Sequence, residues 1–446
     1  MNDQYPELYA SYRWLVPPQF NIAQACLYRW ALNPAEGRRA AIVHETSHGA
    51  QQVWTYAQLA ETTHRLANGL QKMGVAPGDR VAIIMGQHPE TAIALFAILS
   101  LGAVAVPLIP AMSTEQLAQC LNNAQVRVAI LDAASIASVL QLQSHCPQLR
   151  QLIGLDLEHE ATISWRTLLA RQTAAFTPVQ TRATDPALLL YVRKGENYAG
   201  VVLAHQVLIG NLPGFVASQN WFPRPGDVFW TPLDWRLSSG LLCGLLPTLY
   251  FGKAIVSTLE PLSPHSALDL LMRYRVTNAL LTPSILDRLL QVCQETPVNT
   301  ALRAVALLVS AQHPQAPLQA THAALGVLPN VVFNSAETGC IVGMSHEKWP
   351  SDNASIGRPF PGHRVDVLQP DGTPCAAGKT GRLAVNRHDA ALHPDPALFL
   401  GYWKGDGSLL DTTDAQGWHV TPLTVWMDKN RQCWLGRHEG DRSDIG

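Results

Sequence analysis

The chain has 446 residues, of which 47% are hydrophobic and 15% charged, and its formal net charge at pH 7 is −2. So much apolar content with so little charge excludes a largely disordered chain. The near-neutral charge argues against a nucleic-acid partner or an anionic-membrane surface. The polar start MNDQYPELYASYRW does not have the pattern of a secretory signal. We therefore expect a cytoplasmic protein of about three compact units with no nucleic-acid or membrane partner.

Helices and strands are predicted to alternate over the first part of the chain, which indicates βαβ units and a parallel sheet. The expected helices are 54–73, 92–101 and 114–122, and the expected strands are 80–85, 103–108 and 126–131. The uncharged run 92–112 is long enough to cross a membrane. Gly102 breaks it, however, and Pro107 and Pro110 end it. A helix that leads into a buried strand explains the run better than a membrane span does.

A second α/β set is predicted after the Thr- and Gln-rich stretch 171–184. Its expected strands are 187–191, 227–231, 254–257, 279–281, 304–309 and 331–333, and its expected helices are about 206–220, 238–251, 264–275 and 283–294. From about 346 to 436 the pattern changes to short alternating segments with PDGTP and DAQG turns. That region is predicted to be a small antiparallel β unit.

The eight cysteines are spread over the whole chain and form no CxxC pair. A disulfide framework is unusual in a chain of this length. We expect the cysteines to be reduced and mostly buried.

Several stretches, in this order, resemble the adenylate-forming (AMP-binding) superfamily, which includes the acyl-CoA synthetases. They are WTYAQLAETTHRLANGLQKMGVAPGDRVAIIMGQHPE, LSLGAVAVPLIP, GDVFWTPLDW, TPSILDRLL, FNSAETG, SIGRPFPGHRVDVLQPDGTPCAAGKTGRLAV and GW…T…CWLGR. The opening YRWLVPPQFNIAQACLYRWA looks most like the bacterial acetyl- and medium-chain acyl-CoA synthetase branch.

The resemblance implies the large-domain fold of an acyl-CoA synthetase, in which two α/β subdomains with mostly parallel sheets precede a small β-barrel subdomain. We expect the first α/β subdomain at 1–185, the second at 186–345, the β-barrel-like subdomain at 346–436 and a hinge remnant at 437–446. The family also has a small C-terminal domain that supplies a catalytic lysine. Because the sequence ends at Gly446, we expect that domain to be absent.

The family holds the phosphates of ATP with a loop of the type YTSGTTGKPKG. The matching stretch is YVRKGENYAG, from Tyr191 to Gly200, and it contains no Ser or Thr. Arg193, Lys194 and Gly195 are the candidates for an anion contact, but a solvated charged turn is the stronger interpretation. The sequence therefore predicts a degenerate phosphate loop.

Other family positions are partly replaced. Glu337 matches the magnesium ligand, but Ala336 replaces the threonine before it, and Ala311-Gln312-His313 replaces the adenine-side Gly-Gly-Glu. The Thr-Gly-Asp triplet that binds ribose reads Thr421-Pro422-Leu423, and leucine cannot accept the ribose hydrogen bonds. Arg437 matches the hinge arginine, whereas Glu439 and Gly440 replace the hinge aspartates.

An acyl pocket is predicted to survive beside these losses. The residues that match its position in the family are Trp235, Gly240, Phe333, Asn334 and Gly339. An aromatic side chain at such a place more often belongs to the core than to a ligand site.

Three hypotheses of function follow. The first is a pseudoenzyme that does not adenylate and instead binds an acyl or carboxylate ligand, a protein partner, or a second copy over the face that a missing domain would leave open. The second is an active acid–thiol ligase that uses ATP, Mg²⁺ and CoA, with Arg193 and Lys194 in a rebuilt phosphate site. The third is an ATP-independent acyl transferase that uses a free cysteine or His205.

Overall fold

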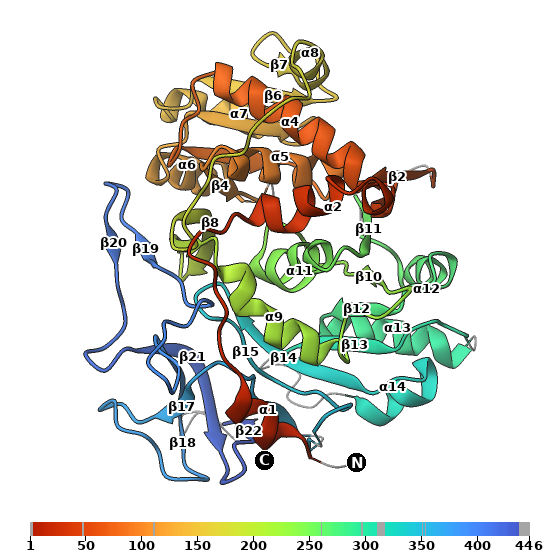
Figure 1. Cartoon of the computed structure of the whole chain (residues 1–446), viewed down its shortest axis with the longest axis vertical. Helices are drawn as coiled ribbons and strands as arrows, with labels where there is room; N and C mark the ends of the chain where they lie inside the picture. Colours follow the sequence, from red (N-terminus) through yellow and green to blue (C-terminus); the bar gives the residue numbers. More distant parts are fainter. Residues whose placement is uncertain are drawn as a thin grey trace, which may run out of the picture.

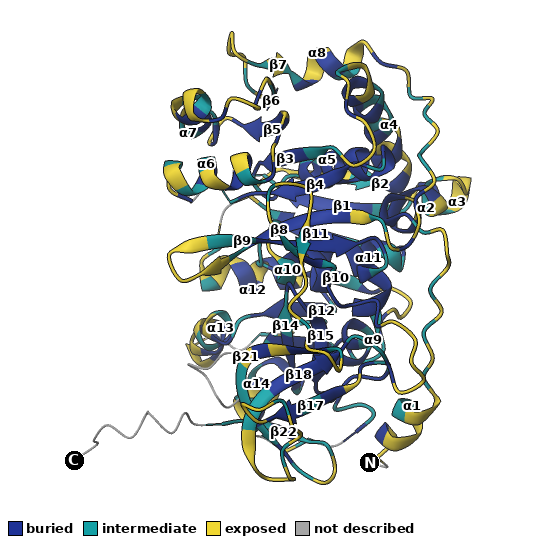
Figure 2. Ribbon diagram, turned by 90° about the vertical axis from the view of Figure 1, so that its left-hand side faces the viewer, coloured by how far each residue is buried: buried dark blue, intermediate teal, exposed yellow. Residues whose placement is uncertain are grey.

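The computed structural model describes residues 3–46, 49–109, 112–259, 261–295, 298–309, 317–349, 351–352 and 354–436. Two large sheets, each flanked by helices, form the body of the molecule (Figure 1). Most of their strands are deeply buried, whereas several of the surrounding helices, such as α6 and α7, expose their outer faces (Figure 2). This layering is the α/β arrangement that the alternating pattern predicts.

The first sheet has nine strands in the order β20-β19-β9-β8-β4-β3-β5-β6-β7. Strands β4, β3, β5, β6 and β7 are parallel, and β8 joins them through β4. The bounds are β3 Arg80–Ile84, β4 Val104–Pro107, β5 Val128–Asp132, β6 Gln151–Leu155, β7 Ile163–Ser164, β8 Pro186–Lys194, β9 Asn197–Ala204, β19 Gly401–Trp403 and β20 Leu409–Leu410.

The helices next to this sheet are α4 Tyr56–Lys72, α5 Pro89–Ser100, α6 Thr114–Asn123, α7 Ile136–Leu142, the 3-10 turn η2 Gln143–His145 and α8 Trp165–Ala170. Helix α4 begins where a capping box predicts, because the Thr55 hydroxyl accepts from the Gln58 N–H and the Gln58 side chain accepts from the Thr55 N–H.

The described part of the uncharged run, residues 92–109 and 112, contains a buried helix followed by a buried strand, as expected. Helix α5 is buried along nearly its whole length, and all four residues of β4 are buried. Over the described residues, no helix is both long and apolar enough to cross a bilayer.

The second sheet has thirteen strands in the order β17-β18-β21-β22-β16-β15-β14-β13-β12-β10-β11-β1-β2. The segment from β14 to β1 is parallel. The bounds are β1 Ala40–Glu45, β2 Gln51–Thr55, β10 Val228–Trp230, β11 Ala254–Thr258, β12 Asn278–Leu281, β13 Ala304–Leu308, β14 Pro329–Ser335, β15 Gly339–Gly343, β16 Ser355–Pro359, β17 Val365–Leu368, β18 Thr380–Asn386, β21 Trp418–Met427 and β22 Cys433–Leu435.

The helices that accompany the second sheet follow the predicted positions closely, although the expected helix 238–251 is divided into three short pieces. They are α9 Val207–Ser218, α10 Ser238–Gly240, the π-turn η3 Leu241–Leu245, α11 Leu246–Tyr250, α12 Pro264–Arg273, α13 Pro283–Glu295 and α14 Leu318–Leu325.

The expected β-barrel at 346–436 is not a closed barrel in the described part of the chain. Strands β16, β17, β18, β21 and β22 are antiparallel, as predicted, but they extend the edge of the thirteen-stranded sheet through the pairing of β15 with β16. The junction is tight: a Cβ on Gly357 would lie 2.0 Å from the carbonyl of Gly343. The small β unit is therefore continuous with the second α/β unit.

The N-terminal segment begins with helix α1, which lies against the C-terminal strands, and continues into short helices that pack on α4 and α11. Its helices are α1 Tyr5–Ser11, the π-turn η1 Gln24–Tyr28, α2 Arg29–Ala31 and α3 Pro34–Gly37. The Tyr5 hydroxyl donates to the Pro359 carbonyl at 2.9 Å, and the Tyr9 hydroxyl donates to the His363 carbonyl at 2.7 Å. Figure 1 shows α1 beside β22, at the end of the molecule opposite to α4 and α8.

Sheet membership differs from the expected subdomain ranges at three places. Strands β1 and β2 pair into the second sheet, whereas β8 and β9 belong to the first. The late hairpin β19–β20 also joins the first sheet, next to β9. The chain therefore passes between the two sheets more often than a division into consecutive ranges predicts.

Candidate functional site

The predicted phosphate loop is a β-hairpin in the structure. Strands β8 and β9 are paired from Pro186↔Ala204 to Lys194↔Asn197, so the two residues Gly195 and Glu196 alone connect them. Gly195 has φ +64°, which a tight turn of this kind requires. The predicted charged turn is thus the turn of a hairpin, and the residues after it continue as β9. A two-residue turn cannot wrap around a chain of phosphates as a longer glycine-rich loop does.

Lys194 forms an ion pair with Glu337 in the candidate site. Its ammonium Nζ lies 3.0 Å from Glu337 Oε1, and the Tyr402 hydroxyl donates to the same oxygen at 2.8 Å. The ammonium also lies over the Tyr402 ring, 5.4 Å from its centroid. One carboxylate oxygen thus holds partners from β8 and from β19.

The charges of this pair are mutually stabilised. Burial would raise the pKa of Glu337, but the hydrogen bonds from Tyr402 and Lys194 outweigh burial and lower it. Burial would lower the pKa of Lys194, but Glu337 outweighs burial and raises it. Both groups are therefore held in their charged forms.

The residues of this site do not fit a bound Mg²⁺. Magnesium requires oxygen ligands in octahedral arrangement, whereas Glu337 Oε1 is occupied by a lysine ammonium, which repels a divalent cation. Within the described ranges, no cluster of three or more His, Cys, Asp or Glu residues could hold a metal ion. In this arrangement a magnesium ion would have to displace the Lys194 ammonium to reach Glu337 Oε1, and the magnesium role of Glu337 stays a prediction.

The other predicted nucleotide residues are engaged elsewhere. The buried Thr421 hydroxyl donates to the Leu383 carbonyl at 2.8 Å. Gly200 packs between strands, because a Cβ there would lie 2.8 Å from Leu189 and 3.3 Å from Trp403. The exposed Arg193 donates to the Gly195 carbonyl at 3.0 Å. Among the described residues that were predicted to bind nucleotide, Lys194 is the one that forms an ion pair with Glu337.

Arg437, Glu439 and Gly440 lie outside the described residues, as does the Ala311-Gln312-His313 stretch.

The five predicted pocket residues lie close to one another but are mostly packed. A Cβ on Gly240 would collide with the Asp234 carbonyl, and one on Gly339 would collide with the Asn211 amide. Trp235 is buried, and its indole N–H has no hydrogen-bond partner. Phe333 belongs to the core of the C-terminal strands. The core interpretation of these aromatic side chains is the one that the packing favours.

Asn334 is the least buried of the five and links two elements of the site. Its Oδ1 accepts from the Ser238 hydroxyl at 3.2 Å. The neighbouring Arg236 donates to Asp234 through Nε at 2.8 Å, but its Nη1 is buried without a partner. The buried N–H groups of Trp235 and Arg236 are donors that a ligand oxygen could satisfy.

Tyr402 is the site residue that sequence reasoning missed. It stands in β19, far along the chain from Lys194 and Glu337, and meets them because β19 pairs with β9. A three-residue strand that begins with a glycine has a weak local signal, so the motif GYW does not by itself indicate that the tyrosine faces Glu337.

Comparison with known proteins places this architecture in a family. The AMP-binding enzyme family matches residues 29–403, and the chain belongs to it. The medium-chain fatty-acid–CoA ligase of Escherichia coli K12 is 30% identical over 267 residues, which are 58% of this chain and 46% of that protein. The mitochondrial acyl-coenzyme A synthetase ACSM5 of Mus musculus is 23% identical over 440 residues, which are 95% of this chain and 73% of that protein.

Solved structures show the same fold. The acyl-CoA synthetase of Brucella canis superposes with a TM-score of 0.88 at 19% identity, and the match covers 98% of this chain and 80% of that one. The fold and the family are therefore those of an acyl-CoA synthetase-like AMP-binding protein, as the sequence resemblance implies.

Proposed function

We propose that this chain is a member of the AMP-binding family that does not form adenylates and instead binds an acyl or carboxylate ligand. The observation that carries the proposal is the ion pair between Lys194 and Glu337, which fills the position where the family resemblance places magnesium. It is supported by the two-residue turn of the β8–β9 hairpin and by Ala336, which has no hydroxyl. Stabilisation of a phosphoryl-transfer transition state depends on such donors and cations.

The ligand class is proposed from donors that have no partner. Trp235 Nε1 and Arg236 Nη1 are buried and unsatisfied, on residues that precede Ser238 in the chain. An unsatisfied buried donor costs about 1–3 kcal/mol, so a carboxylate that accepts from either of them would be stabilised. We place the protein in the cytoplasm because its eight cysteines, all within the described ranges, form no disulfide and seven of them are buried. A protein partner or a second copy is a further candidate for this face.

A calorimetric titration with Mg-ATP tests the proposal. We expect no heat of binding up to millimolar Mg-ATP, and a nonhydrolysable acyl-adenylate mimic should bind through its acyl end alone. The Lys194→Met variant should behave like the wild type towards Mg-ATP. Lys429→Met, at an exposed turn away from the site, is the matched control.

An active ligase with a rebuilt phosphate site predicts the opposite. Tight binding of Mg-ATP by the wild type, lost in Lys194→Met and kept in Lys429→Met, would show that Lys194 contacts phosphate. Formation of acyl-AMP from any carboxylate would contradict the proposal directly.

The structure disfavours an ATP-independent acyl transferase. His205 is completely buried, and its Nδ1 accepts from the Ile22 N–H at 3.2 Å. Burial raises the pKa of Cys120 and of Cys433 to about 12, so neither thiol ionises at neutral pH. Incubation with an acyl thioester should leave the intact mass of the protein unchanged. A stable increase by one acyl group would restore this hypothesis.

A further inference from the structure

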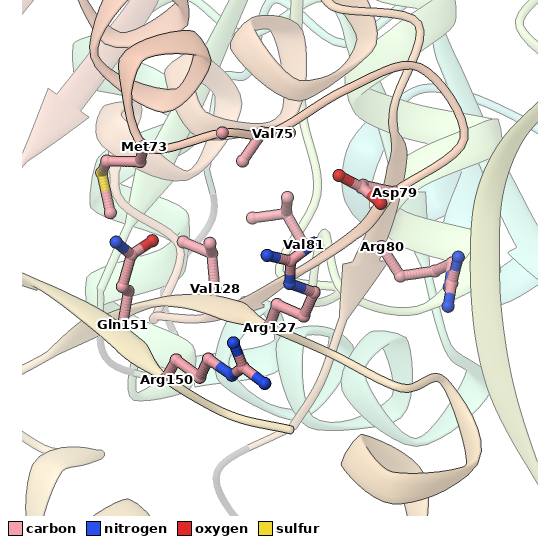
Figure 3. Close-up of a pocket in the computed structure, with 10 residues that line it drawn as sticks. Met73, Val75, Asp79, Arg80, Val81, Arg127, Val128, Arg150 and Gln151 are labelled. Carbon is pink, nitrogen blue, oxygen red and sulfur yellow. The ribbon is translucent and has the colours of Figure 1, made fainter. Parts of the chain in front are cut away.

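A small cavity of about 180 Å³ lies at the edge of the first sheet where the parallel strands begin (Figure 3). Arg80 is the first residue of β3, and Arg127 and Arg150 directly precede β5 and β6. Lys194, by contrast, is the last residue of β8, which runs parallel to these strands through β4. The cavity therefore lies at the N-terminal ends of the strands of this sheet, whereas the Lys194–Glu337 site lies at the C-terminal end of β8.

Two of its arginines stand at neighbouring positions on adjacent strands. Strands β5 and β6 pair with the register Val128↔Gln151, and the Arg150 N–H donates to the Arg127 carbonyl at 3.0 Å. Arg127 and Arg150 are thus the next pair in this register, so their side chains leave the same face of the sheet. Like charges placed opposite each other in a sheet are destabilising. The two arginines lie opposite each other although the repulsion between their charges destabilises the folded sheet.

Neither arginine has a partner that neutralises it. The exposed side chains of Arg127 and Arg150 make no hydrogen bond or ion pair with the described residues. Arg80 is different, because it donates to the carbonyls of Ala124 at 2.8 Å and Gly78 at 3.1 Å. Figure 3 shows the Arg80 side chain directed away from the other two arginines.

The charge of the lining is positive. Three arginines and one acid, Asp79, line the cavity, which gives three positive charges minus one negative, or +2, in a chain whose net charge is −2. The Asp79 carboxylate accepts from the Ala76 N–H at 2.9 Å rather than from Arg127 or Arg150. Guanidinium groups bind phosphate through paired N–H donors.

The rest of the lining is mostly apolar, with Gln151 as its polar member. Met73 and Val75 line one side, and Val81 and Val128 line the strand side (Figure 3). An apolar group next to the anion would be removed from water there, at a gain of about 25 cal/mol per Å².

From these observations the geometry points to a second ligand site: Arg127 and Arg150 bind the phosphate group of a small phosphomonoester whose apolar part contacts Met73 and Val75. The site is separate from the nucleotide position and does not depend on the function proposed above. It requires only the full chain in its folded form.

Calorimetric titration with phenyl phosphate, in buffer without phosphate and at low salt, tests the site. We expect wild-type binding that weakens steeply with added salt, at least a tenfold weakening in Arg127→Gln and in Arg150→Gln, and loss in the double variant. Arg288→Gln, an exposed arginine on α13 with the same change of charge, should bind like the wild type. Thermal melts of every variant check that each is folded.

Inorganic phosphate and phenol are the companion probes. Phenyl phosphate binding more tightly than inorganic phosphate supports a phosphomonoester with an apolar group, whereas equal affinities would show that free phosphate is the ligand of the arginine pair and overturn the apolar contact. The site would be overturned if neither phenyl phosphate nor inorganic phosphate bound at concentrations on the order of 10 mM. It would also be overturned if the double variant bound phenyl phosphate as tightly as the wild type. Mg-ATP plays no part in these titrations, so their failure leaves the proposed function untouched.

Discussion

Replacing Gly357 with alanine is expected to prevent stable folding. A Cβ at this position would lie 2.0 Å from both the carbonyl carbon and the carbonyl oxygen of Gly343, and the backbone φ of +100° is one that side chains rarely adopt. Relief requires the backbones of β15 and β16 to move apart, and the pairing of these two strands joins the C-terminal strands to the second sheet. The cost should exceed about 4 kcal/mol, a large part of the stability of a typical domain. Urea denaturation followed by circular dichroism measures it.

Gly372→Ala is the matched control for this prediction. Gly372 has φ +84°, but nothing lies within 4 Å of the place where its Cβ would stand. It therefore isolates the cost of the left-handed backbone, about 1 kcal/mol. Equal losses in the two variants would mean that the contact between Gly357 and Gly343 is looser than described. Loss of the C-terminal strands alone in Gly357→Ala would show that they fold independently of the second sheet.

Acidification is expected to destabilise the protein through buried histidines, of which His205 is the clearest. Burial lowers the pKa of His205 to about 4, although Asp185 acts in the opposite direction. The folded pKa lies below the unfolded value of about 6.5, so the unfolded chain takes up the proton first. Stability is therefore retained above pH 6.5 and falls as the pH drops towards 4. Between pH 7.5 and 5 this one group should remove about 2 kcal/mol.

The His205→Gln variant should reduce the dependence on pH. Glutamine does not titrate, and its amide oxygen can accept from the Ile22 N–H in place of the histidine Nδ1. Unfolding free energies measured at pH 7.5 and 5 should differ less in this variant than in the wild type. His322→Gln removes an exposed histidine on α14 and should leave the wild-type dependence unchanged. A variant His205→Gln with the full wild-type dependence would show that other groups cause the acid sensitivity.

Most of the fold could be predicted from the sequence, because its evidence is local. The periodicity of the helix at 56–72 and the β-branched composition of short buried strands appear within a few residues of each other. The β-barrel-like unit is an open continuation of the second sheet in the described residues, for a reason that no local pattern contains. Whether antiparallel strands close on themselves or extend a neighbouring sheet depends on the pairing of β15 with β16, and that pairing depends on the close approach at Gly343.

The site could be predicted only in part. The sequence identifies Lys194 and Glu337 separately, each by its position within a family motif. Their ion pair, and the tyrosine that completes it, depend on the pairing of β9 with a strand near residue 402. A glycine among charged residues has the same composition in a tight turn and in a phosphate loop, so the sequence favoured a charged turn without excluding the loop. The hydrogen-bonded register separates the two.

The pairing of β19 with β9 has a consequence for synthesis on the ribosome. Strand β9 ends at Ala204, whereas β19 begins at Gly401, so β9 emerges with its outer edge unpaired while roughly two hundred further residues are made. At typical rates of translation this interval lasts about 10 to 40 seconds. During it the nascent chain carries an open apolar strand edge, which is a template for pairing with other chains. Newly made protein should therefore need protection by a chaperone at this edge until Tyr402 has arrived.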